Sequence, residues 1–303
     1  MLETPAFLPA SAFSLDALGD IFTRAFENYF YPGVTTAAVL AASARTEQLD
    51  LYRSLVMRLG DELAGIALLG LRGDLAWCGG FGVTLPFRGH GLSHKLATAM
   101  LDQARQAGAR GCGLEVLTRN QPAIKTYTRA GFQPLRDLQV LEWRRPQELP
   151  EPGIQCQDQK TVGPADTKLR QQEHDKLQPP LAQSPPTALL AHFAALHPAP
   201  AAWQRDLPAL LVRSGMDGLA LMNGERLRAY ALLTPTPDSG ARVEDVGADD
   251  VERATALLSA LQARYARLIS VNEPADSALT PAFEAAGFIE ADRQHELWVD
   301  LQA

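Results

Sequence analysis

A six-residue run between a predicted strand and a predicted helix holds the residue types best suited to chemistry. It reads Arg88-Gly89-His90-Gly91-Leu92-Ser93. Glycines at alternate positions let the backbone turn sharply and approach a ligand closely. Free amides at the start of the following helix, together with the helix dipole, favour an anion there, and Arg88 adds positive charge. The run is typical of a pyrophosphate site, although an ordinary strand-to-helix turn would explain the same glycines.

Cysteine and histidine give no comparable signal. Cys78, Cys112 and Cys156 lack the spacing of metal ligands, and we expect no metal. Cys78 and Cys112 fall on adjacent predicted strands without a visible partner base, so we interpret both as buried core thiols. His192 and His197 have no acidic neighbours in the sequence that would complete a metal site.

The elements that must position the glycine run follow a clear order in the first half of the chain. Apolar spacing and turn signals predict helices over residues 14–30, 36–45, 91–107 and 122–130 and strands over 55–59, 63–71, 75–83, 112–117 and 138–143. The glycine run thus connects the strand 75–83 to the helix 91–107.

A proline cluster separates this half from a second set of elements. Pro146, Pro150 and Pro152 disfavour both helix and strand, so we place a linker at residues 146–153. The second half repeats the order, with predicted helices over 164–177, 187–196 and 250–266, strands over 218–222, 227–233, 242–246, 268–271 and 294–299, and a helix ending at Gly287. The repeat predicts two α/β (α+β) domains, residues 1–145 and 154–303, each a mixed, mostly antiparallel twisted sheet flanked by helices.

The glycine run resembles the acyl-CoA motif of GNAT acyltransferases, Arg/Gln-x-x-Gly-x-Gly/Ala, with Ser93 at the last position. A second signature of that family, Asn-x-x-Ala-x-x-x-Tyr-x-x-x-Gly-Phe, follows without a gap from Asn120 through Tyr127 to Phe132. The resemblance covers about residues 7 to 145 and is strongest from Leu75 to Phe132. The chain is therefore similar to tandem members of the GNAT superfamily.

The resemblance implies acetyl-CoA as co-substrate and a set of residues that bind it. Pantetheine would lie between the strand ending at Val83 and the strand 112–117. Tyr127 would act as general acid for the departing thiolate. The implied cofactor-binding residues are Val83, Arg88, Gly89, His90, Gly91, Leu92, Ser93 and Asn120, of which Asn120 contacts pantetheine or caps its helix.

The general base and the acceptor pocket are less defined. No carboxylate lies in the strand 75–83, and Glu115 on the next strand is a candidate for the base or for orienting the acceptor. Tyr29, Tyr31 and Trp77 are candidates for the wall of the acceptor pocket, and each could equally be a core aromatic.

The second half lacks both chemical features. The segment that matches the glycine run reads Val246-Gly247-Ala248-Asp249-Asp250-Val251-Glu252, whose carboxylates would repel a pyrophosphate. The position of the tyrosine is taken by Phe283, which cannot donate a proton. We therefore interpret the second half as a degenerate GNAT-like domain that shapes the acceptor site of the first.

These observations predict an N-acyltransferase that moves an acetyl group from acetyl-CoA to a primary amine of a small molecule or peptide. One alternative is a protein that binds or senses acyl-CoA without turnover. A further alternative is an aminoacyl or peptidyl transferase, which the acidic balance makes less attractive.

Composition and charge indicate which classes of binding partner to expect. The 303 residues are 46% hydrophobic and carry a net charge of −7, which argues against a nucleic-acid partner. No segment has the pattern of a signal peptide or a membrane span, so we expect a cytoplasmic protein without a membrane partner. A homodimer is compatible with the sequence.

Overall fold

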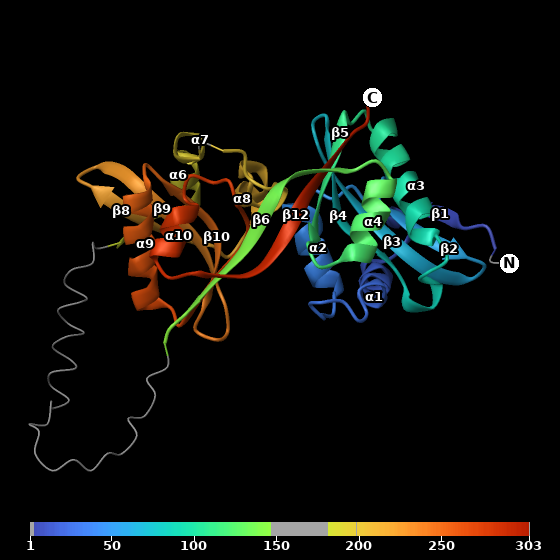
Figure 1. The fold of residues 1–303 in the computed structure, drawn as a ribbon, viewed down its shortest axis with the longest axis horizontal. Coiled ribbons are helices and arrows are strands. Elements are labelled where there is room, and N and C mark those ends of the chain that lie inside the picture. Colours follow the sequence, from blue (N-terminus) through green and yellow to red (C-terminus); the bar gives the residue numbers. More distant parts are fainter. Residues whose placement is uncertain (1–2, 147–180, 198, 303) are drawn as a thin grey trace, which may run out of the picture. The chain divides into compact units, whose positions relative to one another are not determined.

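The computed structural model describes residues 3–146, 181–197 and 199–302. The chain forms two compact units, and each takes residues from both halves of the sequence (Figure 1). Unit 1 comprises Met1–Leu138, Ala202–Arg213 and Arg293–Ala303, and unit 2 comprises Gln139–Ala201 and Ser214–Asp292. The predicted helix 164–177, Cys156 and nearly all of the predicted linker 146–153 lie outside the described residues.

Unit 1 is a twisted sheet with helices on its faces. Its strands lie in the order β1-β2-β3-β4-β5-β12-β6, all described pairs being antiparallel except β4 with β5. The elements are β1 (Ala6–Pro9), η1 (Ala10–Ala12), α1 (Leu15–Ala25), α2 (Ala37–Thr46), β2 (Leu55–Leu59), β3 (Glu62–Arg72), β4 (Leu75–Val83), η2 (Leu85–Phe87), α3 (Leu92–Gln106), β5 (Gly111–Leu117), α4 (Gln121–Arg129), the first part of β6 (Gln133–Arg144), η3 (Trp203–Arg205), α8 (Leu207–Val212) and most of β12 (Ile289–Asp300).

Unit 2 repeats this plan with shorter helices. Its strands lie in the order β6-β11-β10-β9-β8-β7, and β10 pairs with β11 in parallel. The remaining elements are β7 (Leu181–Gln183), α6 (Pro186–Leu190), α7 (Phe193–Leu196), β8 (Asp217–Asn223), β9 (Arg226–Pro235), β10 (Ala241–Ala248), α9 (Val251–Arg264), β11 (Arg267–Pro274) and α10 (Thr280–Ala285).

Two glycines in β4 let α1 lie close to the sheet. A Cβ on Gly80 would collide with the ring of Phe22, and one on Gly82 would come within 2.9 Å of the Ala25 side chain. The register shifts by one residue opposite Leu68 and Leu69, which leaves Gly79 as the extra residue of a bulge. A bulge of this kind increases the local twist of a strand, and this one lies four residues before the end of β4 at Val83.

The last strand of the chain completes the sheet of unit 1. Residues Gln294 to Asp300 of β12 pair antiparallel with β5. The indole of Trp298 occupies the space above Gly111, where a Cβ would overlap it. The compact units therefore differ from the two contiguous stretches expected from a cut at residues 146–153, because the C-terminal strand pairs with the first half.

Most sequence predictions agree with the observed elements. The predicted strands 55–59 and 75–83 match β2 and β4 residue for residue. The predicted helix 14–30 ends early at Ala25, and the predicted helix 187–196 divides into α6 and α7. The sequence patterns did not predict β1, β7 or α8. Within the described ranges, no helix has the length and apolar character needed to cross a membrane.

Candidate active site

Strands β4 and β5 separate after a short parallel contact. They pair only where Leu75, Ala76 and Trp77 face residues 111–113, although β4 continues to Val83 and β5 to Leu117. On its other edge β4 remains paired with β3 as far as Val83. The second half of β4 thus has an edge without a described ladder partner, and this edge borders the gap in which pantetheine was expected.

Arg88 fixes the turn that follows β4. Its guanidinium donates to the carbonyl oxygens of Val83 at 2.9 Å, Ala25 at 3.0 Å and Glu27 at 2.9 Å. These bonds connect the turn to the end of α1. The sequence suggested that Arg88 simply adds charge beside an anion, whereas the structure shows that this side chain also holds the backbone of the turn.

The two glycines of the run adopt conformations that other residues avoid. Gly89 has φ +79° and Gly91 has φ +75°, and a Cβ on either would meet open space. Gly91 precedes α3 and has no side chain that could cap it. In contrast, Ser14, Thr36 and Asn120 cap α1, α2 and α4, respectively. No hydrogen bond from the described part of the chain reaches the amides of residues 89–93. The turn therefore presents unoccupied donors at a helix N-terminus.

His90 and Ser93 lie differently in this turn. His90 is exposed, and the Ser93 hydroxyl lies 3.3 Å from that of Thr126 on α4. Asn120 caps α4 by accepting a hydrogen bond from the Ala123 amide at 3.3 Å, which is one of the two roles expected for it.

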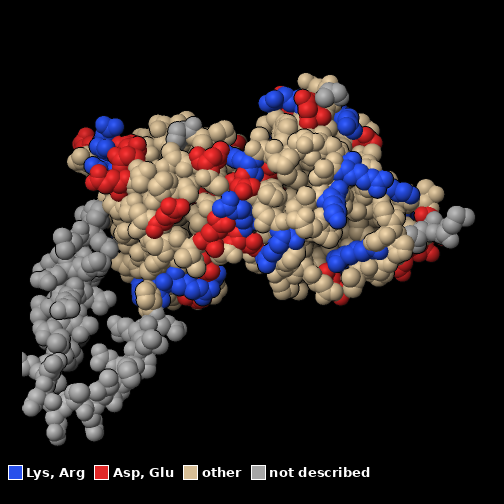
Figure 2. Space-filling model, viewed as in Figure 1, with Lys and Arg blue, Asp and Glu red and all other residues tan. Residues whose placement is uncertain are grey.

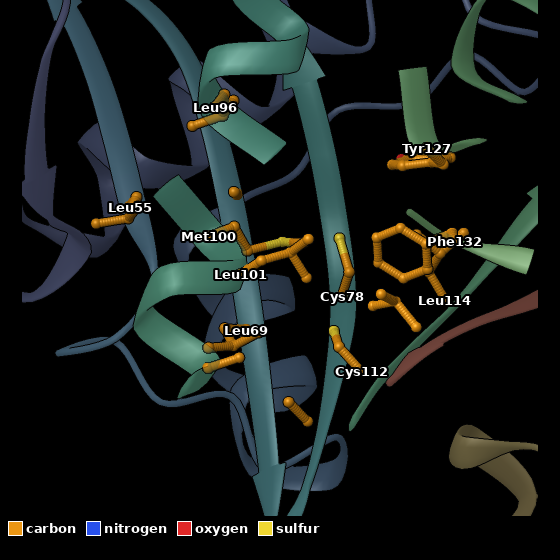
Figure 3. Packing of buried hydrophobic residues seen from close by; sticks show 14 of the residues in the cluster. Leu55, Leu69, Cys78, Leu96, Met100, Leu101, Cys112, Leu114, Tyr127 and Phe132 are labelled. Atoms are coloured by element: carbon orange, nitrogen blue, oxygen red, sulfur yellow. The ribbon is translucent and has the colours of Figure 1, made fainter. Parts of the chain in front are cut away.

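Tyr127 projects from α4 into the core of unit 1. Figure 3 draws it next to Phe132, and Cys78 and Leu114 belong to the same core cluster. Its ring makes edge contacts with Phe81 at 5.5 Å and Phe132 at 5.7 Å between centroids. Burial raises the pKa of Tyr127 well above its usual value, so the phenol keeps its proton in the neutral range.

The two thiols of unit 1 lie in the same cluster. Burial raises the pKa of Cys78 to about 12 and that of Cys112 well above its ordinary value. Both cysteines are free and buried. Neither side chain has the thiolate character that nucleophilic catalysis requires.

Glu115 lies on β5 with its carboxyl group on the face opposite to this cluster. Trp77, from β4, donates its indole N–H to Glu115 Oε2 at 2.8 Å. Burial, followed by the charge of Glu296, raises the pKa of Glu115 to about 8. The carboxyl group therefore changes protonation state close to neutral pH, as a general base must.

Two side chains that no sequence pattern indicated complete the surroundings of Glu115. Trp203 stacks on Trp77 with centroids 5.7 Å apart, and Gln204 hydrogen-bonds to the Glu115 carboxyl. Both residues come from the second half of the sequence but belong to unit 1. Nothing in their spacing announces this role, because only the folded chain brings them to β4 and β5.

Tyr29 and Tyr31 follow α1 in an aromatic segment. Tyr29 makes edge contacts with Phe26 at 5.2 Å and Phe30 at 5.3 Å. Tyr31 is 55% exposed, and the Arg119 guanidinium lies 4.5 Å from the Phe30 ring centroid and 5.5 Å from that of Tyr31. Trp77, in contrast, is only 3% exposed. Its indole N–H donates to the Glu115 carboxyl instead of facing solvent.

Unit 2 fills the corresponding positions with its own side chains. Asp250 caps α9 by accepting from the Arg253 amide at 2.8 Å, and Asp249 forms an ion pair with Arg228 at 2.5 Å. Phe283 is fully buried. The helix N-terminus that should receive a phosphate is thus already occupied by carboxylates.

Side chains also fill the face of β10 that points away from the core cluster containing Val243 and Val246. Asp245, which is 2% exposed on its side chain, accepts from the Tyr230 hydroxyl at 2.7 Å and contacts His197 Nε2 at 2.9 Å. The Tyr230 ring packs where a Cβ of Gly247 would lie. Across the described residues, no group of three His, Cys, Asp or Glu side chains is arranged to hold a metal ion.

Comparisons with known proteins agree with this geometry. Residues 15–132 match the Acetyltransferase (GNAT) family. No match is found among curated proteins. The fold resembles a GCN5-related N-acetyltransferase from Sphaerobacter thermophilus with TM-score 0.66 and 14% identity, over 98% of this chain and 96% of that one.

Two further solved structures share the fold along nearly the whole chain. A putative acetyltransferase from Pyrococcus horikoshii has TM-score 0.62 and 14% identity, over 99% of this chain and 90% of that one. A tandem GNAT protein from the clavulanic acid biosynthesis pathway has TM-score 0.63 and 13% identity, over 98% of this chain and 99% of that one. Residues 15–132 thus match the GNAT acetyltransferase family, and the chain as a whole shares the fold of solved GNAT proteins, a tandem member among them.

Proposed function

We propose that unit 1 transfers an acetyl group from acetyl-CoA to a primary amine by direct attack. One observation carries the proposal: beyond Trp77, β4 has an edge with no ladder partner among the described residues, and after η2 comes a turn whose amides, at residues 89–93, have no described protein acceptor. A pantetheine arm can extend the sheet along such an edge, while amides at a helix N-terminus suit the pyrophosphate.

Surface charge supports the same cofactor. On the face of unit 1 drawn in Figure 2, several Lys and Arg side chains lie over the region where Figure 1 draws α3 and α4. Basic side chains over these two helices favour a polyanionic ligand on this face even though the whole chain is acidic.

The reaction needs a neutral amine and a stabilised leaving group. The amine nitrogen attacks the thioester carbonyl carbon, and a C–N bond forms as the C–S bond breaks. Tyr127, whose phenol is protonated at neutral pH, gives that proton to the departing sulfur. Alignment of the two substrates supplies much of the remaining rate enhancement.

Glu115 is the base that we assign to the amine. Its pKa of about 8 makes it a much better proton acceptor than an exposed carboxylate. It lies on β5, the strand that diverges from β4 at the proposed pantetheine site. The proton passes from the attacking amine to Glu115, directly or through one water.

The test combines acetyl-CoA with a panel of polyamines, aminoglycosides, amino acids and peptide N-termini, and measures CoA release together with the mass of the acetylated product. Glu115→Gln and Tyr127→Phe should each reduce turnover on any accepted amine by about a hundredfold. Acetyl-CoA that binds with no acetylated product from any amine would instead favour a sensing protein.

Unit 2 has no turnover of its own in this proposal. Asp249 and Asp250 occupy the helix start and Phe283 replaces the acid. Its contribution is structural, because the chain that forms it also supplies Ala202–Arg213 and Arg293–Ala303 to unit 1.

A further inference from the structure

The segment Ala202–Arg213 is the part of unit 1 that comes from the middle of the second half. It contains η3 and α8, and α8 packs against α2. Asp206 caps α8 by accepting from the Leu207 amide at 2.8 Å and also forms an ion pair with Arg72 at 3.7 Å. The segment is therefore attached to unit 1 at both its helix and its preceding turn.

Trp203 is held by contacts in several directions. Its indole N–H donates to the Glu47 carbonyl at 2.9 Å, and its own carbonyl accepts from Arg72 Nη1 at 2.9 Å. The Arg72 guanidinium carbon lies 3.9 Å from the centroid of the same ring. Gly70 leaves room for the indole, since a Cβ there would lie 3.3 Å from it. The ring is thus clamped between β3 and Trp77.

The clamp brings Gln204 to Glu115. The Glu115 carboxyl then has two side-chain donors, the Trp77 indole at 2.8 Å and the Gln204 amide. We propose that Gln204, held in place by Trp203, is a positioning residue that aims the Glu115 carboxylate and keeps it ionisable. This inference rests on the proposed role of Glu115 as base, and it makes the site of the first domain depend on a residue from the second half.

The charges around Glu115 explain why such a donor is needed. Glu296 on β12 faces Glu115 across the strand pair, and Glu47 adds a second like charge. Glu296 forms an ion pair with Arg136 at 2.5 Å. The nearby Arg72 forms an ion pair with Asp206. Burial and the two glutamates disfavour the carboxylate, whereas hydrogen bonds to it from Trp77 and Gln204 favour it. Loss of one donor therefore shifts the balance toward the protonated, inactive form.

The protonation state of Glu115 can be read without knowing the acceptor. Protein labelled with ¹⁵N-tryptophan is titrated from pH 5 to 10, and the indole resonance of Trp77, assigned with Trp77→Phe, reports on the carboxyl that it contacts. The full-length wild type should show a midpoint near the pKa of about 8, and Glu115→Gln should abolish it.

Two substitutions of opposite effect test Gln204. Gln204→Met, similar in size but without a donor, should raise the midpoint by about one unit, a change of about tenfold in the ionisation equilibrium. Gln204→Lys, a cationic donor, should lower it. Trp203→Leu should act like Gln204→Met because it removes the clamp. Gln133→Met, at an exposed position on β6, is the matched control.

Steady-state kinetics on any amine that the panel identifies provide a second test of Gln204. Gln204→Met should lower kcat at pH 7 up to about tenfold, leave the KM for acetyl-CoA unchanged, and have no further effect in the Glu115→Gln background. A merely structural role would lower activity in both backgrounds and leave the Trp77 titration unmoved.

The outcomes separate the two proposals. If Glu115→Gln abolishes the titration and most of the turnover but neither Gln204 variant moves the midpoint, the positioning role is wrong and the base stands. If Glu115→Gln leaves turnover intact, the base itself is wrong. If Gln204→Met fails to fold, Gln204→Lys alone decides, because an unchanged or raised midpoint contradicts the inference.

Discussion

The indole rings of Trp77 and Trp203 stack with their centroids 5.7 Å apart and their planes 7° from parallel, although 126 positions separate them (203 − 77). Trp77 donates to Glu115, and the residue after Trp203 contacts the same carboxyl. The pair therefore joins the proposed site of the first domain to the second half of the chain.

We expect one acetyl-CoA site per chain, lost in Gly91→Glu. The substitution places bulk and negative charge in the turn and forces a residue with a Cβ into φ +75°. Isothermal calorimetry should give a stoichiometry of one for the wild type and binding weakened by more than about tenfold in the variant.

Gly73→Glu is the matched control for that experiment. Gly73 has φ +57° in the β3–β4 hairpin and also borders open space, so backbone strain is similar but the phosphate turn is untouched. Two equivalent sites in the wild type would contradict the assignment of unit 2 as inactive, and equal loss of binding in both variants would attribute the effect to strain.

Tyr127→Phe should separate chemistry from binding. Only a hydroxyl is lost, and the contacts with Phe81 and Phe132 need only the ring. Turnover should fall about a hundredfold with the acetyl-CoA Kd almost unchanged. Tyr52→Phe, at a position 80% exposed, serves as control. An unchanged single-turnover rate would assign Tyr127 to packing alone, since that measurement excludes limitation by product release.

Glu115 should also make stability depend on pH. Its folded-state pKa of about 8 lies above the reference value of 4.5, so between these values the folded protein holds a proton that the unfolded chain has released. The contribution to stability is complete below about pH 4.5 and is lost as the pH rises toward 8, with a slope of at most ~1.4 kcal/mol per pH unit.

Urea unfolding of wild type and Glu115→Gln from pH 5 to 9 measures this slope. The variant has no ionisable group at that position, so its free energy of unfolding should rise relative to that of the wild type as the pH rises. Glu62→Gln, exposed at the start of β3, is the control. A difference between wild type and Glu115→Gln that does not vary with pH would show that Glu115 titrates at its ordinary value.

The C-terminal strand should stabilise unit 1. Leu297 on β12 is 2% exposed and belongs to the same core cluster as Tyr127. Leu297→Ala should cost about 2–5 kcal/mol and increase amide hydrogen exchange in β5. Leu268→Ala, fully buried in the core of unit 2, should instead affect β10 and β11, and the reverse pattern would contradict this division.

For the same reason, a chain ending at residue 145 should not give a folded CoA-binding protein. It lacks Ala202–Arg213 and Arg293–Ala303, and therefore both the Trp203 clamp and the strand that covers β5. A soluble fragment that binds acetyl-CoA with the affinity of the whole protein would show that these segments are dispensable.

The sequence by itself predicted the local features of the site. Glycines at 89 and 91 allow the positive φ that both adopt, and Asn120 caps α4, which is one of the two roles that the family resemblance implied for it. The alternation and turns around β2 and β4 likewise gave their bounds. Such features depend on residues within a few positions of one another, so periodicity and turn chemistry are enough to predict them.

Only the tertiary structure decided what surrounds Glu115. Its raised pKa depends on burial and on Glu296, which reaches β5 because the last strand of the chain pairs there. Trp203 and Gln204 lie next to it only because Ala202–Arg213 joins unit 1. Pairing between distant strands, and the burial that it produces, depends on the whole packed sheet, and no local pattern in the sequence encodes it.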